Sequence, residues 1–313
     1  MERLCFGIDI GGTSVKLGLF NEKGNLLDKW DIPTRTDNGG ELILADVASS
    51  VQNKIEEAKL VKEQIIGIGI GVPGPVMEDG TVLRCVNLGW GVFNVADEMK
   101  RLTGFNTKAG NDANVAALGE MWQGGGKGYK NLIMVTLGTG VGGGVILDGE
   151  ILTGSKGAAG EIGHITVNYD EKDSCNCGKH GCLEQFASAT GIVKEARRLL
   201  NKSEEPSKLR ELQHLSSKTI FDCAKEGDIL ANRLVEQLGW YLGIALSHVA
   251  SVVDPQAFVI GGGVSKAGSM LTDLIKKYYE NNVMIALKDK EFKLAELGND
   301  AGIYGSAKLI IGK

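Results

Sequence analysis

Three cysteines lie within eight residues, at Cys175, Cys177 and Cys182, and His164 precedes them in the stretch HITVNYDEKDSCNCGKHGCLEQ. Such a group could form disulfides, carry out thiol redox chemistry or bind a metal. Cys175 and Cys177 are too close in sequence to pair comfortably, and a redox C-x-x-C motif is missing. Three thiolates and one imidazole form a closed tetrahedral zinc set with no position left for substrate. The spacing therefore predicts a structural metal site, and three merely buried cysteines are the alternative.

Composition limits the classes of function. The chain has 313 residues, enough for a sizeable core and about two domains. Its formal charge of −5 argues against a nucleic-acid or anionic-membrane partner, because both favour a basic surface. The opening MERLCFGIDIGGT does not read as a secretory signal, and no apolar stretch approaches the roughly 20 residues that span a bilayer. We therefore expect a cytoplasmic protein, in which disulfides are disfavoured.

Glycine is the unusual residue, with 45 copies, about twice the average frequency. The glycines cluster where apolar runs end, in FGIDIGGT, IIGIGIGVPGP, MVTLGTGVGGG and FVIGGGVS. Glycine at the end of a strand lets the backbone turn sharply and approach a ligand closely. Four such clusters predict one site that is assembled from several loops.

Strands and helices alternate along the chain, which indicates an α/β protein. The patterns predict strands near 4–10, 15–20, 65–71, 132–138, 143–148 and 257–261, and helices near 40–59, 112–122, 188–200, 219–225, 228–252, 265–280 and 302–311. The segment that begins at Asp9 resembles the one that begins at Thr136. In both, an apolar strand meets a Gly/Thr turn, and a second strand runs on to Gly24 or Gly149. Two unrelated hairpins are the plain interpretation, and a duplicated fold is the sharper one.

Each of these turns offers clustered backbone N–H groups and a threonine hydroxyl, from Thr13 or Thr139, which together suit an anion. Neither turn is a P-loop or a convincing dinucleotide motif. Asp9 would repel phosphate unless a divalent cation lay between them, and Mg²⁺ suits carboxylate and phosphate oxygens. A turn-capping aspartate is the alternative. The third loop, GGGVS, could receive nucleotide phosphate or ribose, with Ser265 as the expected helix cap.

Taken together, these segments resemble the ROK family of the actin/hexokinase-like superfamily. The resemblance covers essentially the whole chain, through GIDIGGTSVKLG, VPGPV, NDANVAALGE, LGTGVGGGVILDG, GAAGEIGH, CNCGKHGCLE and GGGVS. It implies two ribonuclease-H-like domains, with ATP and a hexose bound in the cleft between them. The expected domains are a smaller one, 1–110 plus about 302–313, and a larger one, 111–301, that carries the zinc-bound loop.

The resemblance assigns roles to particular residues. Asp112 would be the base that accepts the hydroxyl proton during phosphoryl transfer, although an acidic residue at a helix start is common without any chemistry. His164 would both contact the sugar and bind the zinc. The sugar contacts would be Gly74, Asn87, Asn111, Asp112, Glu161, His164 and Glu184. MgATP would be bound by Asp9, Gly11, Gly12, Thr13, Lys16, Gly138, Thr139, Gly140, Gly142, Gly261, Gly262 and Gly263.

Zinc would then have a structural role, because it connects the turn that carries Glu161 to the loop that carries Glu184. Cys5, Cys85 and Cys223 lie outside this cluster and are expected to be ordinary buried thiols.

The sequence therefore predicts a hexokinase of carbohydrate metabolism and glycolysis, in which glucose becomes glucose 6-phosphate. The choice of glucose as the substrate rests on overall likeness to bacterial ROK glucokinases. Kinases for N-acetylmannosamine, N-acetylglucosamine, fructose or allose share these motifs. A ROK repressor is disfavoured, since the strand with Asp9 starts within a few residues of Met1 and leaves no room for a helix-turn-helix extension. A pure sugar-binding module is disfavoured by the intact Asp9 and Asp112. The family implies a homo-oligomer, a dimer or a tetramer.

Overall fold

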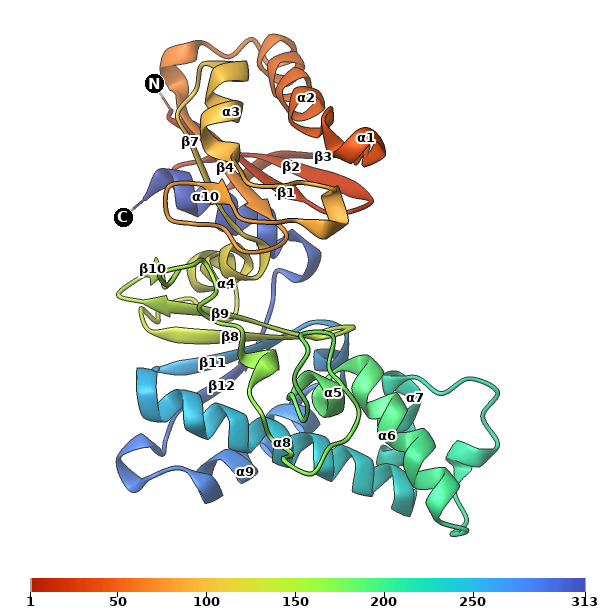
Figure 1. Cartoon of the computed structure of the whole chain (residues 1–313). Helices are drawn as coiled ribbons and strands as arrows, with labels where there is room; N and C mark the ends of the chain where they lie inside the picture. The colour runs from red at the N-terminus through yellow and green to blue at the C-terminus, as the bar shows by residue number, and fades with distance from the viewer. Residues whose placement is uncertain (1, 313) are drawn as a thin grey trace. The chain divides into compact units, whose positions relative to one another are not determined.

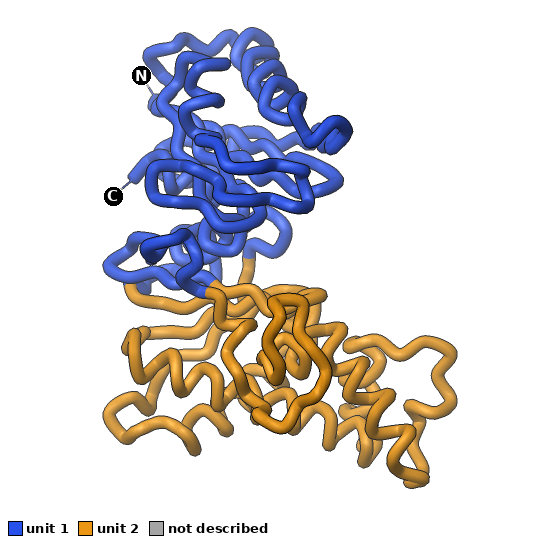
Figure 2. Tube along the Cα trace, viewed as in Figure 1, with its two compact units in different colours: residues 1–130, 144–160, 297–313 blue, residues 131–143, 161–296 orange. Residues whose placement is uncertain are grey.

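The structure, a computed structural model, describes residues 2–312. The chain forms two compact units (Figure 2), of which unit 1 contains residues 1–130, 144–160 and 297–313 and unit 2 contains residues 131–143 and 161–296. Sheets of five strands are combined with helices, so the predicted α/β class is confirmed. Among residues 2–312, no helix has both the length and the apolar character needed to cross a membrane.

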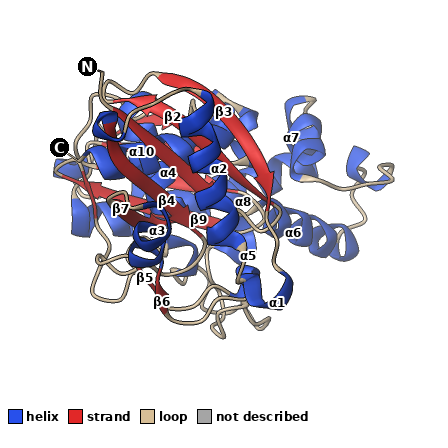
Figure 3. Cartoon of the chain, turned by 90° about the horizontal axis from the view of Figure 1, so that it is seen from above, coloured by secondary structure: helices blue, strands red, loops and turns tan. Residues whose placement is uncertain are grey.

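The sheet of unit 1 has the strand order β3-β2-β1-β4-β7. β2 pairs antiparallel with β1 and β3, whereas β1, β4 and β7 run parallel. Helices α2 and α3 lie on one face of the sheet and α10 on the other (Figures 1 and 3). The elements of unit 1 are β1 Leu4–Ile10, β2 Ser14–Asn21, β3 Leu26–Pro33, α1 Asp37–Gly40, α2 Ile43–Glu57, β4 Ile65–Val72, β5 Thr81–Val82, β6 Phe93–Asn94, α3 Val95–Thr103, β7 Thr107–Asn111, α4 Asp112–Gln123, β10 Glu150–Ile151 and α10 Ala301–Ile311.

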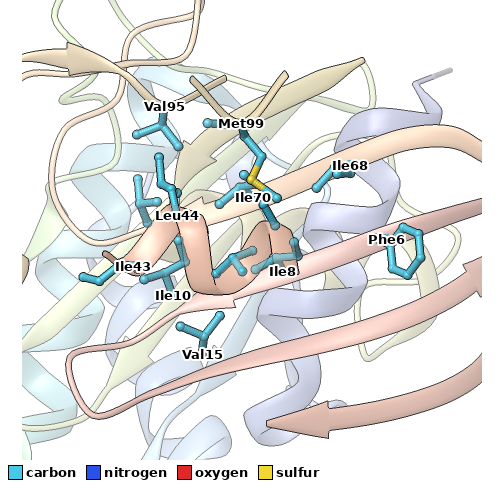
Figure 4. Packing of buried hydrophobic residues seen from close by; sticks show 14 of the residues in the cluster. Phe6, Ile8, Ile10, Val15, Ile43, Leu44, Ile68, Ile70, Val95 and Met99 are labelled. Atoms are coloured by element: carbon cyan, nitrogen blue, oxygen red, sulfur yellow. The ribbon is translucent and has the colours of Figure 1, made fainter. Parts of the chain in front are cut away.

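The core of unit 1 follows from the two-residue period of its strands. Phe6, Ile8 and Ile10 alternate along β1, so their side chains point to the same face and pack against apolar residues of α2 and α3 (Figure 4). Cys5 points to the opposite face, where it belongs to a smaller buried cluster with residues of α10 such as Ile303. Both faces of the sheet are therefore covered within unit 1.

Helix α10 approaches its neighbours unusually closely. A Cβ atom on Gly69 of β4 would lie 1.7 Å from the carbonyl oxygen of Ser306, and one on Gly305 would lie 1.5 Å from the carbonyl oxygen of Val115 in α4. Any side chain at these positions would collide with backbone, so only glycine permits this packing. The glycines inside the run IIGIGIGV thus allow α10 to pack closely against β4. The sequence predicted a role for them only in turns near a ligand.

The second sheet has the order β10-β9-β8-β11-β12. Strands β8, β11 and β12 lie in unit 2 and run parallel. β9 begins in unit 2 and continues into unit 1, where it pairs with β10. In unit 2, α8 and α9 lie side by side. The remaining elements are β8 Leu132–Leu137, β9 Val141–Leu147, α5 Glu184–Ala187, α6 Ala189–Lys202, α7 Ser217–Lys225, α8 Ile229–Val253, β11 Ala257–Gly261, α9 Ser269–Asn282 and β12 Glu291–Leu294.

The two sheets repeat one pattern. In each, two strands form a hairpin, a third strand extends the hairpin at one edge, and two parallel strands extend the sheet at the other. The hairpins are β1–β2 and β8–β9, which contain the two segments that resemble each other in sequence. The predicted duplication is therefore confirmed.

Several predictions about elements need correction. Strands β3, β7 and β12 and helix α3 were not predicted. Ser265 does not cap α9, because the chain first forms a 3₁₀ turn over Gly263–Ala267 and the Ser265 hydroxyl donates to the carbonyl oxygen of Gly262. The expected domain boundary after residue 110 also differs from the observed division, since α4 packs against α10 and belongs to unit 1.

Candidate active site

Asp9 lies near the end of β1, opposite Lys16 of β2. Burial, and secondly the charge of Asp112, raise the pKa of Asp9 from its ordinary 3.8 to about 6, while Lys16 acts in the opposite direction. The first turn of α10 passes close to this carboxyl group, since a Cβ atom on Gly302 would lie 2.5 Å from it. The predicted cation ligand and the predicted base are thus electrostatically coupled in unit 1.

The turn after β1 is ordered by its own backbone. Gly11 donates its N–H to the carbonyl oxygen of Ser14 at 3.0 Å, and the hydroxyl of Thr34 donates to the carbonyl oxygen of Gly11 at 2.7 Å. Gly12 and Thr13 are exposed. The ammonium group of Lys16 donates a hydrogen bond to the carbonyl oxygen of Asn299 at 3.0 Å. The turn is therefore held in one shape by its own hydrogen bonds, and Lys16 is tied to the segment before α10.

Asn111 and Asp112 meet Gly74 at the start of α4. The side-chain amide of Asn111 donates to the Gly74 carbonyl oxygen at 3.0 Å and to Oδ1 of Asp112 at 2.9 Å. Its own oxygen accepts from the N–H of Asn114, which makes Asn111 the N-cap of α4. Because Asn111 fills the capping role, Asp112 is not needed as a cap. The carboxylate is instead held by Asn111 and by the Ala113 N–H at 2.8 Å.

The CVNLGW segment forms a turn beside this group. A Cβ on Gly74 would lie 2.6 Å from the carbonyl oxygen of Arg84, so the two loops touch. The pKa of the buried Cys85 thiol is raised by burial and, to a smaller extent, by the charge of Asp112. Asn87 is exposed on the 3₁₀ turn Val86–Leu88. The segment is therefore positioned to border a ligand at Asp112.

In unit 2, the turn between β8 and β9 rests on the start of α6. Ala189 donates its N–H to the carbonyl oxygen of Gly138 at 2.8 Å, and the Thr190 hydroxyl donates to that of Thr139 at 2.6 Å. A Cβ on Gly140 would lie 2.7 Å from Oε2 of Glu184. The second predicted phosphate turn and a predicted sugar contact are therefore neighbours, and Gly142 follows within β9.

The third glycine loop follows β11, with Gly261 as its last strand residue. Gly262 has a φ of +83°, and a Cβ there would lie 2.5 Å from the carbonyl oxygen of Leu137, so this loop lies against the end of β8. A cavity of about 130 Å³ separates Gly263 from α7, where Phe221 and Lys218 are among its lining residues. The loop and the cavity offer backbone, apolar and basic groups in one place.

The four predicted metal ligands come together in unit 2. The ligand atoms of His164, Cys175, Cys177 and Cys182 all lie within 4.8 Å of one another. Sγ of Cys177 and Sγ of Cys182 are 3.6 Å apart, and Sγ of Cys175 lies 3.7 Å from Nδ1 of His164. A tetrahedron with Zn–S bonds of about 2.3 Å has edges of roughly 3.8 Å. The donor set therefore fits zinc in both chemistry and size.

His164 presents its two ring nitrogens to different partners. Nδ1 faces Cys175, whereas Nε2 lies 3.9 Å from Oε2 of Glu161, the residue that begins the same short turn. Glu184 Oε1 lies 3.0 Å from Sγ of Cys175 and 3.7 Å from Nδ1 of His164. Glu161, His164 and Glu184 are thus assembled around one cluster. Cys5, Cys85 and Cys223 are buried elsewhere, as predicted.

Two groups of residues were missed by the sequence analysis. Arg198 of α6 donates to Glu171 at 2.6 Å and to Glu195 at 2.8 Å, and it also contacts Asp173, so it clamps the cysteine loop to the helix. Glu120 is fully buried, and it accepts N–H bonds from Gly125 at 2.9 Å and Leu297 at 2.8 Å. The acidic run DEKD before Cys175 was the available signal for the clamp, whereas nothing local pointed to Glu120.

The repeated sheets, the glycine turns and the cysteine cluster define a class of protein. A sequence model of the ROK family matches residues 5–313, and the chain belongs to this family. The glucokinase of Halalkalibacterium halodurans is 42% identical over 99% of this chain and 95% of that protein.

Solved structures agree with this assignment. A ROK family glucokinase from Streptomyces griseus, in complex with glucose and AMPPNP, has a TM-score of 0.74 and 33% identity over 98% of both chains. The ROK hexokinase from Thermus thermophilus has a TM-score of 0.78 and 30% identity over 97% of this chain and 96% of that one. The predicted actin/hexokinase-like fold is therefore confirmed.

Proposed function

We propose that this chain transfers the γ-phosphoryl group of MgATP to the 6-hydroxyl of glucose. The observation that carries the proposal is the arrangement at the start of α4, where Asn111 caps the helix and also donates to Asp112. Asp112 is thereby oriented as a carboxylate without serving as the cap. The glucokinases among the similar proteins support glucose as the acceptor.

In the proposed reaction, Asp112 accepts the proton of the 6-hydroxyl as that oxygen attacks the γ-phosphorus. The new O–P bond forms while the bond from the γ-phosphorus to the bridging oxygen breaks, and ADP leaves with the electron pair. Positioning and electrostatics supply most of the acceleration in such transfers. Gly74, Asn87, Asn111, Glu161, His164 and Glu184 are assigned to hold the sugar hydroxyls.

Asp9 is assigned to the Mg²⁺ that accompanies ATP, directly or through water. When bound, this ion would neutralise charge on the phosphate oxygens. The raised pKa of Asp9 supports the assignment, because a carboxylate in a site that disfavours its charge gains most from a cation. The phosphates are assigned to three glycine loops, at Gly11, Gly12 and Thr13 with Lys16, at Gly138, Thr139, Gly140 and Gly142, and at Gly261, Gly262 and Gly263. The nucleoside is assigned to the space between the third loop and α7, where Phe221 and Lys218 lie.

Zinc is proposed as a structural ion that is held by His164, Cys175, Cys177 and Cys182. His164 would bind it through Nδ1, which leaves Nε2, on the Glu161 side, to meet a sugar hydroxyl. Unoxidised thiolates require a reducing compartment, so a cytoplasmic location belongs to the proposal. The predicted homo-oligomer remains a prediction, which light scattering of the purified protein checks.

A coupled ADP-release assay over a panel of hexoses tests the function. Glucose should give the highest kcat/KM, and N-acetylmannosamine, N-acetylglucosamine, fructose and allose should give lower values. A higher kcat/KM with an N-acetylated hexose would overturn the choice of glucose while leaving the kinase reaction intact. Sugar-dependent ADP release that is missing with every hexose, from protein with its full zinc content, would overturn the kinase proposal itself.

A further inference from the structure

The CVNLGW segment forms a closed loop with Asn87 near its tip. Cys85 and Trp90 pair across the base of the loop, where each donates its backbone N–H to the carbonyl oxygen of the other at 3.0 Å. Between them, the 3₁₀ turn Val86–Leu88 and Gly89, which has a φ of +75°, reverse the chain. Asn87 is exposed on this turn. The contacts that hold the base of the loop therefore also set the position of Asn87.

The segment α1 interlocks with this loop. The indole N–H of Trp90 donates to the carbonyl oxygen of Gly40 at 3.1 Å. A Cβ atom on Gly40 would lie 2.4 Å from the carbonyl oxygen of Leu88, and one on Gly89 would lie 2.8 Å from Cα of Gly39. The two backbones thus touch at glycines, and one side-chain hydrogen bond connects them. We call these contacts the interlock.

The backbone of α1 has an uncommon conformation at the interlock. Asn38, Gly39 and Gly40 have φ values of +51°, +73° and +68° in succession. A left-handed conformation is unfavourable for a residue with a side chain, and it persists where the surrounding structure determines it. This run ends at Gly40, whose carbonyl oxygen accepts the bond from Trp90. The strained segment therefore delivers an acceptor to the indole.

Trp90 is suited to hold this junction. Its surface is only 6% exposed, and its ring meets that of Phe93 edge-on, with 5.1 Å between the centroids. A buried indole N–H needs an acceptor, which Gly40 supplies. A cavity of about 400 Å³ adjoins the interlock and is lined by Gly40, Gly89 and Trp90 among others. Because open space lies there, dense packing does not hold the two segments together on that side, and the indole bond carries more of the positioning.

The loop also touches the residues at the start of α4. A Cβ atom on Gly74 would lie 2.6 Å from the carbonyl oxygen of Arg84, which directly precedes the loop, and 3.7 Å from Cα of Cys85. The carbonyl oxygen of Gly74 in turn accepts from Asn111. The loop therefore connects the interlock to the group around Asp112.

We propose that Trp90 is a positioning residue for the sugar site, because its bond to Gly40 holds the CVNLGW loop where Asn87 meets a sugar hydroxyl. This inference rests on the proposed function, which assigns Asn87 to the sugar. Trp90 acts only through Asn87 and not on the substrate itself. The affinity that Trp90 contributes is therefore limited to the contribution of the Asn87 contact.

Calorimetric titration of the full chain with glucose, without nucleotide, tests this inference. Trp90→Phe keeps an aromatic ring but removes the indole N–H, so glucose binding should weaken by roughly two- to tenfold, the effect of one lost hydrogen bond. Asn87→Ala should weaken it by a similar factor. The double variant should bind as weakly as Asn87→Ala alone, whereas two independent effects would multiply.

Trp30→Phe is the matched control. Trp30 of β3 also donates its indole N–H, to the hydroxyl of Ser50 at 2.8 Å, and also meets a phenylalanine ring edge-on, that of Phe6. This variant should bind glucose as the wild type does. In steady-state assays, Trp90→Phe should raise the KM for glucose by the same factor as the Kd and leave kcat within about twofold, since Asp112 is untouched.

Gly40→Ala disturbs the interlock from the other side, and Gly128→Ala, at a φ of +98° with open space around it, is its control. If Trp90→Phe fails to fold, weaker glucose binding in Gly40→Ala than in Gly128→Ala, without further loss in the Asn87→Ala background, supports the inference. The inference is overturned if Trp90→Phe binds as Trp30→Phe does, or if its loss multiplies with that of Asn87→Ala. If Asn87→Ala binds glucose like the wild type, the inference falls together with the assignment of Asn87, while glucose-dependent ADP release would still support the kinase reaction.

Discussion

The hairpin turns of the two units share a backbone plan and differ in what surrounds them. In unit 1, the strand before the turn carries Asp9, whose pKa is raised to about 6 by burial and by Asp112. In unit 2, the corresponding position is Thr136, and the turn is braced by Thr190 and contacts Glu184. The turn of unit 1 thus lies beside a buried carboxylate, and the turn of unit 2 lies beside Glu184, which contacts the cysteine cluster. Both hairpins keep a Gly/Thr turn, while the side chains around the two turns differ.

The largest expected effect is a fall in turnover that leaves sugar binding nearly unchanged. Asp112→Asn keeps the size of the side chain but removes its ability to take a proton. Because general base catalysis contributes about 10²–10⁴-fold, kcat should fall by that order. The Kd for glucose should change far less, since Asn111, Glu161, His164 and Glu184 remain. Stopped assays of kcat beside calorimetric glucose titrations measure both.

Asp97→Asn is the matched control for this variant. Helix α3 also begins with an asparagine cap, Asn94, and also has an aspartate in its first turn. The control therefore reproduces the loss of helix-dipole stabilisation without touching the site. If Asp112→Asn keeps its turnover within a few-fold of the control, Asp112 is not the base.

Asp9→Asn should lower kcat by about 10²–10³-fold, as expected for one lost electrostatic contact to the phosphoryl group. Its apparent affinity for Mg²⁺ should fall while glucose affinity stays unchanged. Asp31→Asn, on the exposed face of β3 and also opposite Lys16, is the control. Titration of MgCl₂ in steady-state assays is the measurement, and lost glucose binding with unchanged MgATP kinetics would contradict the assignment.

Although Asp9→Asn should lower kcat, it should raise the free energy of unfolding. The folded-state pKa of Asp9 is raised from 3.8 to about 6, so the stability that its protonated form contributes is lost as pH rises through this interval. Without Mg²⁺ and nucleotide, Asp9→Asn should be more stable than wild type by on the order of 2 kcal/mol at pH 7.5, and by less at pH 5. Urea unfolding at both pH values checks the trend, and an equal gain at both would refute the charge explanation.

Cys177→Ser, or chelation of zinc, should act on unit 2. Outer-shell changes at metal sites already cost about 10–100-fold in metal affinity, so loss of a ligand should do at least as much. Glucose binding should be lost, and exposure of residues 161–184 to hydrogen exchange should rise, while nucleotide binding remains. Cys223→Ser, outside the cluster, is the control. Zinc-free protein with full activity would contradict this role.

The smallest expected effect concerns the brace of the second turn. Thr190→Val removes the hydroxyl that donates to the Thr139 carbonyl oxygen. Loss of one such bond should raise the KM for ATP by roughly two- to tenfold and leave the KM for glucose nearly unchanged. Thr272→Val, which removes a comparable hydroxyl bond within α9, should change neither constant.

Local patterns were enough to predict most of this architecture. The cysteine spacing, the two Gly/Thr turns and the apolar runs of β1, β4, β8 and β11 each carry their signal within a few residues. Strand β7 was missed because TKAGN has no run of β-branched residues, and it exists only because β4 offers a parallel edge. Strand β3 was missed because most of its residues are exposed and three charged residues interrupt its apolar positions.

Contacts between distant residues could not be predicted in this way. The close approach of α10 to Asp9 involves residues almost a chain length apart in sequence. The Arg198–Glu171 ion pair connects a helix to an irregular loop. The placement of Ser265 was wrong because a 3₁₀ turn precedes α9, and the competing turn leaves little trace in composition. Such features depend on tertiary packing, which no short segment encodes by itself.

The close packing of α10 against Gly69 of β4 and, through its own Gly305, against α4 has a consequence for biosynthesis. Unit 1 lacks this helix until the ribosome has made all of unit 2, because residues 131–143 and 161–296 come first in the chain. Domains generally fold as units during synthesis. We therefore expect unit 2 to mature first, while the face of β1 and β4 that receives α10 waits uncovered. A nascent chain that stalls before residue 301 would expose this face to chaperones.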